Sequence, residues 1–322
     1  MKKKNLWLFL PLLALAALAL IFTGRGERRA DNAPAPPVSQ EKTVLKIGYL
    51  PITHATALVM AHQEQNGAFA NFNMEVVKFS SWPELTEALF AGHIQGAVML
   101  FELALAGRQR GIPIQTVALG HRDGNVMVAR AEIETVADLR GRRVAIPSRF
   151  SVHNILLYKA LQNAGLQYQD VEVVEMAPPD MMAALARGEI EAYLVAEPFG
   201  AIAEVQGVGK VLHSSQEIWE NSTCCVLALR EEVLRENPNA AAELVAALLA
   251  AGEAAEANPE KAVAVSRQYF GHAENILAPG LARTTFRQLA PSIGEFEQHQ
   301  QYLVELGLLP QPVDLREFIN EE

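Results

Sequence analysis

The stretches SWPELTEALFAGHI (residues 81–94) and APPDMMAALARGEI (residues 177–190) share one residue pattern at a constant offset of 96. In both, a proline precedes an acidic residue, an Ala-Leu pair follows, and a glycine stands two positions before an isoleucine. The same offset relates Leu50-Pro51 to Ile146-Pro147, Val77 to Val173 and Asn125 to Asn221. A single register held over about eighty positions indicates an internal repeat.

Each repeat alternates short apolar runs with helical patterns, which is typical of a parallel-rich α/β sheet. We expect strands at 44–50, 74–79, 96–99, 114–119 and 224–229, and helices at 55–65, 83–91, 101–110, 240–257, 259–269, 279–289 and 295–306. The repeat predicts an α/β fold with two similar lobes, each a sheet flanked by helices. Lobe I would comprise 41–127 and 224–322 and lobe II 128–223, with crossovers near Asn125 and Asn221. The helices after residue 240 are expected to pack on lobe I.

Composition and charge narrow the class of protein. The chain has 322 residues, half of them hydrophobic, and a net charge of −10, which disfavours a nucleic-acid partner. Residues 1–40 carry a charge of +4, and they contain Lys2–Lys4 followed by an uncharged run from Asn5 to Gly24 that is rich in Leu and Ala. This segment is interpreted as a secretory signal peptide or a retained membrane anchor, followed by a proline-rich linker. Either alternative places the remaining chain outside the cytoplasm.

The two cysteines, Cys224 and Cys225, are adjacent and open an apolar run. Vicinal cysteines form a strained disulfide ring, so we interpret them as core residues of a strand, with redox chemistry or metal binding as the less favoured alternative. His54, His121 and His153 fall on loops, but no spacing of carboxylates or cysteines accompanies them. The sequence therefore predicts no metal and no cofactor, and it favours a single histidine as a hydrogen-bond donor.

The candidate site follows from the predicted strand ends, because ligands of open α/β sheets bind beyond the carboxyl ends of the strands. No motif of a covalent enzyme or of a phosphate-binding loop occurs. The loops instead offer hydroxyls, amides, imidazoles and rings. The predicted ligand-binding residues are Thr53, His54, Trp82, Phe101, Asn125, Ser148, Ser151, His153 and Glu197.

Most of these residues have a second interpretation. The hydroxyls of Thr53, Ser148 and Ser151 would serve equally as helix caps. Trp82 could line a cleft or pack in the core, and core packing is favoured for Phe101. Glu197 could bind a ligand or cap the following helix, and these alternatives are equal on the sequence.

The chain resembles the periplasmic substrate-binding proteins of ABC importers for nitrate, sulfonates, taurine and bicarbonate, over essentially residues 43–310. The nitrate/bicarbonate branch looks closest. The resemblance rests on Pro178-Pro179, Gly188–Ala192, Ala196–Phe199 and Gln206–Gly209, together with Ser81–Pro83 and Val152–Asn154. It implies the type II periplasmic-binding-protein fold, which closes on its ligand, with Trp82, His153 and Glu197 lining the cleft. Asn125 stands where that branch often has Gln.

Two departures from the branch keep the ligand open. Phe150-Ser151-Val152 replaces an expected Gly-Gly-Thr, and His54 stands where the branch often has Asp. The ligand is therefore a small anion or a small organic compound such as nitrate, a sulfonate or a pyrimidine-like molecule. The partners implied are an ABC permease in the membrane and its ATPase, with the binding protein a monomer and no enzyme. The alternatives are an enzyme on the same fold, using His54, His121 or Glu197 as acid or base, and a membrane-tethered sensor.

Overall fold

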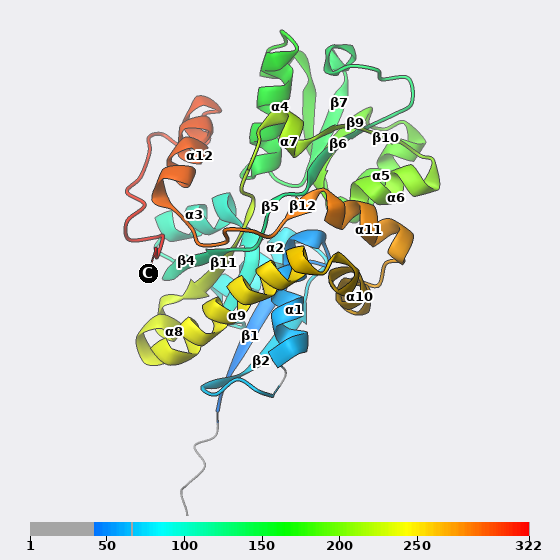
Figure 1. The fold of residues 1–322 in the computed structure, drawn as a ribbon. Coiled ribbons are helices and arrows are strands. Elements are labelled where there is room, and N and C mark those ends of the chain that lie inside the picture. The colour runs from blue at the N-terminus through cyan, green and yellow to red at the C-terminus, as the bar shows by residue number, and fades with distance from the viewer. Residues whose placement is uncertain (1–41, 66, 322) are drawn as a thin grey trace, which may run out of the picture. The chain divides into compact units, whose positions relative to one another are not determined.

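The computed structural model describes residues 42–65 and 67–321, which form two five-stranded sheets flanked by helices (Figure 1). The first sheet has the order β2-β1-β3-β11-β4 and the second the order β10-β6-β9-β7-β8. The strands of the first sheet are β1 (Thr43–Tyr49), β2 (Phe72–Lys78), β3 (Gly96–Leu100), β4 (Ile114–Leu119) and β11 (Cys225–Arg230). Those of the second are β6 (Asn125–Ala129), β7 (Arg143–Ile146), β8 (Glu172–Glu175), β9 (Ala192–Ala196) and β10 (Lys210–Ser214).

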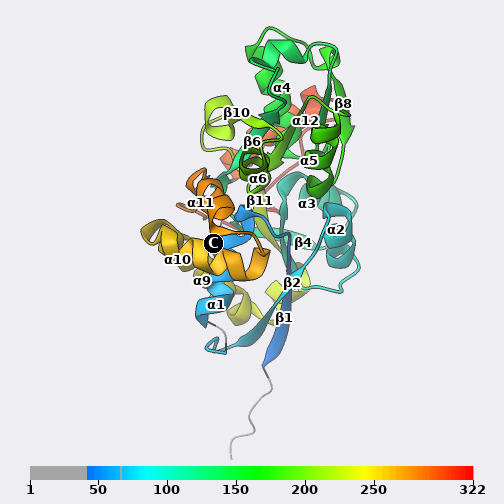
Figure 2. The ribbon, with the colours of Figure 1, turned by 90° about the vertical axis from the view of Figure 1, so that its right-hand side faces the viewer.

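Helices connect and cover these strands (Figures 1 and 2). The helices up to the second crossover are α1 (Thr56–Gln65), α2 (Trp82–Phe90), α3 (Phe101–Gln109), α4 (Val152–Asn163), α5 (Pro178–Arg187), α6 (Phe199–Gln206) and α7 (Ser215–Ile218). Those after it are α8 (Glu231–Glu236), α9 (Pro238–Ala257), α10 (Pro259–Phe270), α11 (Glu274–Ala282) and α12 (Ile293–Glu305). Three 3-10 turns, η1 (Thr53–Ala55), η2 (Val136–Leu139) and η3 (Tyr168–Asp170), and the short strands β5 (Arg122–Asp123) and β12 (Thr284–Thr285) complete the set of elements.

The structure confirms the internal repeat. Helices α1 and α4 begin 96 positions apart, as do α2 and α5, β3 and β9, and β4 and β10. The two sheets also have equivalent strand orders, with β8, β7, β9 and β10 in the places of β2, β1, β3 and β4. The α/β fold expected from the sequence is therefore correct.

The fifth strand of each sheet comes from the chain that follows the other repeat. Strand β11 lies antiparallel between β3 and β4, and β6 lies antiparallel between β9 and β10. Both strands consist of buried residues apart from Arg230, since each has neighbours on both edges and helices on its faces. The strand predicted at 224–229 is β11, which begins and ends one residue later. The chain returns to the first sheet at this strand, as predicted.

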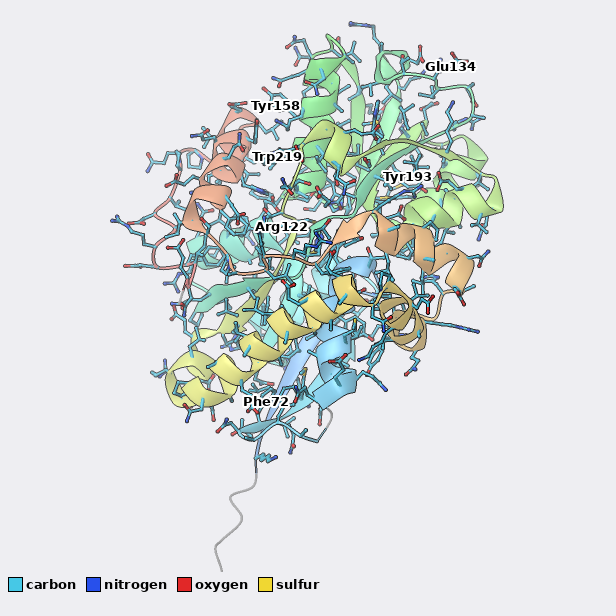
Figure 3. The ribbon with its side chains drawn as sticks, in the orientation of Figure 1. Phe72, Arg122, Glu134, Tyr158, Tyr193 and Trp219 are labelled. Carbon is cyan, nitrogen blue, oxygen red and sulfur yellow. The ribbon has the colours of Figure 1, made fainter. Side chains whose placement is uncertain are left out.

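The two crossovers lie side by side. The Asp123 amide donates to the Ser222 carbonyl at 2.8 Å, and Arg122 forms a bridge with Thr223. Asp123 and Asn221 both have positive φ, at 54° and 58°, as the sharp turns there require. The Arg122 side chain, labelled in Figure 3, pairs with Glu295 at 2.7 Å and ties this region to α12. The lobe boundaries drawn at 127 and 223 stay a prediction.

One expectation for the C-terminal region is wrong. The helix predicted at 279–289 is instead α11, which ends at Ala282, with Pro279 inside it and β12 following to pair with β5. The Thr284 hydroxyl donates to the Gly280 carbonyl at this helix end. The C-terminal helices α11 and α12 contact both halves of the molecule: α11 contacts η1 and α6, and α12 contacts α4 while its Phe296 stacks on Phe101 of α3.

The predicted signal peptide or anchor, with its linker, lies outside the described residues. Within residues 42–321, apart from position 66, no helix has both the length and the apolar character needed to span a membrane.

Candidate functional site

A cavity of about 680 Å³ opens between α2 and α3 on one side and the ends of β7 and β8 on the other. Trp82 and Ser148 line it, from the first and second halves of the molecule. The indole is almost fully buried, and its Nε1 has no hydrogen-bond partner among the residues that the structure describes. Trp82 also belongs to the hydrophobic core, so both interpretations of this residue apply.

Among the other fully buried polar side chains with atoms that lack partners, three belong to residues that the sequence singled out. Within the described part of the chain, hydrogen bonds are lacking for both side-chain amide atoms of Asn125 and for both ring nitrogens of His153. His121 Nδ1 also has no partner there. We call Asn125, His121 and His153 the unpaired cluster. Asn125 begins β6, His121 lies between β4 and β5, and His153 lies in the first turn of α4. Because burying an unsatisfied polar group costs about 1–3 kcal/mol, such a group calls for a partner from outside the chain, either a ligand or an ordered water.

The histidines in this region are neutral. Burial lowers the pKa of His54 and of His153 to about 3, and the neighbouring His54 ring contributes to the shift at His153. Burial also lowers the pKa of His121 well below its ordinary value, with the His54 ring adding to the effect. Each ring therefore offers one N–H donor and one lone pair at neutral pH.

Thr53 and Glu197 belong to a different arrangement, in which the polar atoms are paired. The Thr53 amide donates to the Glu197 carbonyl at 2.8 Å, and its hydroxyl lies 2.9 Å from that of Thr284. One carboxylate oxygen of Glu197 lies 2.5 Å from the Arg283 guanidinium, and the other accepts from the Ala201 amide at 3.0 Å. We call Thr53, Glu197, Arg283 and Thr284 the paired cluster. Burial raises the pKa of Glu197, and its contact with Ala201 favours the helix-cap alternative.

The remaining predicted residues make structural contacts. Phe101 stacks on Phe296 with ring centroids 3.9 Å apart, as expected for a core residue. Ser151 is the N-cap of α4 and accepts from the Asn154 amide. The Ser148 hydroxyl accepts from the Phe150 amide at 3.1 Å while it lines the cavity.

The sequence reasoning missed one association, that of the cysteines with two histidines. Cys225 Sγ lies 3.6 Å from His54 Nδ1, and the Cys225 amide donates to His121 Nε2 at 3.2 Å. The signal was the predicted return of the chain to the first sheet at Cys224. Combined with the loop positions of the two histidines, that return would have brought the four residues together.

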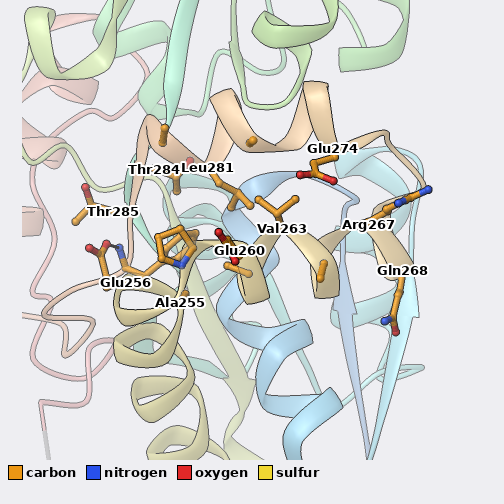
Figure 4. Close-up of a pocket in the computed structure, with 16 residues that line it drawn as sticks. Ala255, Glu256, Glu260, Val263, Arg267, Gln268, Glu274, Leu281, Thr284 and Thr285 are labelled. Carbon is orange, nitrogen blue, oxygen red and sulfur yellow. Dashed lines mark hydrogen bonds between the residues drawn. The ribbon is translucent and has the colours of Figure 1, made fainter.

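A second hollow, of about 1130 Å³, lies elsewhere. It is bordered by α9, α10, α11 and β12, where Glu256, Glu260, Arg267 and Glu274 contribute charged side chains (Figure 4). None of the nine predicted site residues lines it.

These features define the class of protein. Two repeated α/β sheets meet at a junction that contains buried, unpaired polar side chains, as in proteins that enclose a small molecule between two lobes. The chain belongs to the NMT1-like family, whose model matches residues 39–268.

Individual relatives support this assignment. The chain is 32% identical to the nitrate import ATP-binding protein NrtC of Synechococcus elongatus over 68% of its length and 36% of that protein. It is 25% identical to a putative aliphatic sulfonates-binding protein of Escherichia coli over 85% of its length and 88% of the relative. The first curated relatives are longer proteins, of which the chain spans about two fifths.

A solved structure shows the same fold. The ligand-binding component of an ABC-type import system from Staphylococcus aureus, with zinc bound, superimposes with a TM-score of 0.82 at 31% identity, covering 87% of this chain and 97% of the other. Solute-binding components of ABC import systems are thus the proteins that this chain is similar to.

Proposed function

We propose that the chain is an extracytoplasmic solute-binding protein that delivers a small solute to an ABC-type importer. The solute is an anion or a small organic compound, such as nitrate, a sulfonate or a pyrimidine-like molecule. The partners are a membrane permease and its ATPase, and the chain acts as a monomer without nucleic acid. The segment before residue 41 directs export or holds the chain at the outer face of the cytoplasmic membrane.

The observation that carries this proposal is the unpaired cluster. Asn125 offers an amide donor and an acceptor, and His153 offers a ring donor and an acceptor, all buried and unused. A small solute with hydrogen-bonding groups would satisfy these atoms in a desolvated environment, where each bond is strong. The cavity beside Trp82 and Ser148, which none of the three residues of the unpaired cluster lines, would offer an aromatic wall on the approach to the junction.

The proposed closure of the two halves on the solute is supported by one contact of the paired cluster. Thr53 lies at the end of the first sheet and Glu197 at the end of the second, so their 2.8 Å hydrogen bond joins the two halves. A solute that binds both halves would shift the population toward this closed state, which the permease would recognise.

The same side chains support a binding role over an enzymatic one. A general base works best when its pKa lies near the operating pH, whereas the pKa of His54 is about 3. Both carboxylate oxygens of Glu197 are engaged, by Arg283 and by the Ala201 amide.

A thermal-shift panel tests the proposal. Metal-free protein is heated with nitrate, bicarbonate, aliphatic sulfonates or pyrimidines, and one class is expected to raise the melting temperature. At one hundred times the dissociation constant, the expected stabilisation is about 2.7 kcal/mol. Asn125→Ala and His153→Leu should abolish the shift, while the exposed controls Asn73→Ala and His93→Leu should retain it. Folded protein that no solute stabilises would refute the proposal.

A further inference from the structure

Four metal-ligating side chains meet beneath the junction. The ligand atoms of His54, His121, Cys224 and Cys225 all lie within 4.8 Å of one another, and all four residues are fully buried. We call these residues the His–Cys cluster. The topology explains how they meet: β11 lies next to β4, so the start of β11 comes beside the residues that follow β4. His54 follows β1 and reaches the same place.

The histidine geometry suits metal coordination. His54 Nε2 lies 3.0 Å from the Gly124 carbonyl and donates to it, which leaves the lone pair on Nδ1, 3.6 Å from Cys225 Sγ. A histidine ligand is commonly oriented in this way, by a hydrogen bond from its other nitrogen to a carbonyl. The His121 ring stacks on His54 with centroids 3.4 Å apart and ring planes 19° from parallel, so one ring has to turn for a nitrogen of each to face the same ion. Coordination by either nitrogen of His121 would displace only the 3.2 Å hydrogen bond from the Cys225 amide.

The sulfur atoms are free to act as ligands. Neither cysteine forms a disulfide, and their Sγ atoms lie 3.8 Å apart. Burial raises the pKa of the Cys224 thiol well above its ordinary value, so this thiol is protonated in the metal-free protein. A divalent ion would displace one proton from each thiol to solvent, and no oxidant or reductant is needed.

We propose that the His–Cys cluster binds one borderline-soft divalent transition-metal ion of the Zn²⁺ class. Two neutral imidazoles and two thiolates form a tetrahedral donor set that such ions prefer. The charge of the ion and those of the two thiolates cancel, so the complex is neutral in a place where an uncompensated charge would be very costly. This site shares His121 with the unpaired cluster but goes beyond the proposed function, since it requires neither transport nor a particular solute.

Cobalt(II) provides the direct test on the full, reduced and metal-free chain. Co²⁺ is titrated as a spectroscopic probe, and Zn²⁺ is then added as a competitor. We expect one equivalent to give a thiolate-to-cobalt charge-transfer band and intense tetrahedral bands in the visible region, both removed by Zn²⁺. Calorimetry of Zn²⁺ binding in buffers of different ionisation enthalpy should show about two protons released per ion.

Variants assign the site. Cys225→Ser, Cys224→Ser and His54→Gln should each weaken binding at least 100-fold or remove the charge-transfer band. The exposed control His93→Gln should bind as the wild type does. Circular dichroism identifies any variant that fails to fold. The titration of the wild-type protein tests the proposal even if such variants have to be set aside. Absence of the band in folded, reduced wild type, or its persistence in Cys225→Ser together with His54→Gln, would overturn the proposal. The solute panel on metal-free protein is read separately, so failure of one proposal leaves the other intact.

Discussion

The paired and unpaired clusters both lie between the two sheets, and both are buried, yet they differ in how their polar atoms are satisfied. In the paired cluster, Glu197 has a guanidinium on one oxygen and an amide on the other. In the unpaired cluster, Asn125 and His153 have no partner among the described residues for any side-chain nitrogen or oxygen. The two clusters contain similar residue types and are buried to a similar degree. In the ligand-free protein, however, the paired cluster stabilises the fold and the unpaired cluster destabilises it.

This difference separates residues that stabilise the fold from residues available to a ligand. Removing a partner from a paired group leaves a buried charge or dipole unsatisfied, which lowers stability. Removing an unpaired group relieves a cost that the free protein bears. The predictions below test this distinction.

The largest effect is expected for Arg283→Ala. It leaves the Glu197 carboxylate, fully buried, without its guanidinium partner, and should lower the free energy of unfolding by about 3 kcal/mol. The control is Arg287→Ala, whose ion pair with Glu256 involves an Arg side chain that is 69% exposed, and which should change stability by less than about 1 kcal/mol. Urea unfolding measures both, and equal effects would contradict the assignment.

Gly124→Ala should lower stability by about 2 kcal/mol or more. Gly124 has φ of 74°, and an added Cβ would lie 2.5 Å from Thr284 Oγ1 and 3.1 Å from His54 Nε2. Gly141→Ala is the matched control, because it has φ of 72° with open space around its Cβ position, and should cost only about 1–2 kcal/mol for the left-handed backbone. If chemical denaturation gives the same loss for both, crowding at Gly124 is unimportant.

Acidification should destabilise the ligand-free, metal-free protein through His153. Its pKa is about 3 in the folded chain against 6.5 for the ordinary group, so the unfolded chain binds more protons below pH 6.5. The stability that this histidine preserves is complete above pH 6.5 and falls by about 1.4 kcal/mol per pH unit toward pH 3. Unfolding is measured at pH 7, 6 and 5. The free energy of unfolding should fall less steeply with decreasing pH in His153→Leu than in the wild type. Parallel slopes would show that His153 is protonated alike in both states.

The smallest effect is expected for His153→Leu at neutral pH in the absence of solute. Loss of two unsatisfied nitrogens should leave stability unchanged or raise it by up to about 1 kcal/mol. Asn154→Leu, one residue along the same helix, removes hydrogen bonds to Tyr168 and to the Arg149 carbonyl and should lower stability. A similar loss in both variants, measured by thermal unfolding, would place His153 with the paired residues.

The sequence predicts much of the fold because the repeat is recognised from local features, namely the residues that start and end helices. Prolines at helix starts and glycines at helix ends recur at one offset, and α2 and α5 begin where that offset requires. The prediction of a helix at 279–289 is wrong at both ends. Pro279 lies within α11 and does not start a helix, and the chain beyond α11 turns back as β12 to pair with β5. That pairing is a tertiary contact without a local signature.

The candidate site is less predictable for a related reason. Residue type and loop position brought Asn125, His153 and Glu197 into one group, but they do not tell which polar atoms find partners inside the protein. Glu197 is paired because Arg283, on a distant helix end, lies beside it. Cys225 meets His54 because β11 returns to the first sheet. Both facts depend on how remote segments pack.

The position of β11 also has a consequence for biosynthesis. Strand β11 lies between β3 and β4, so the hydrogen bonds that join β4 to its own sheet wait for residues more than a hundred positions further on. A nascent chain that has just emerged through β4 has an incomplete sheet, and it stays so until Arg230 has left the ribosome. The export proposed above, in an unfolded state, fits this topology, since the first half has no early opportunity to complete its sheet.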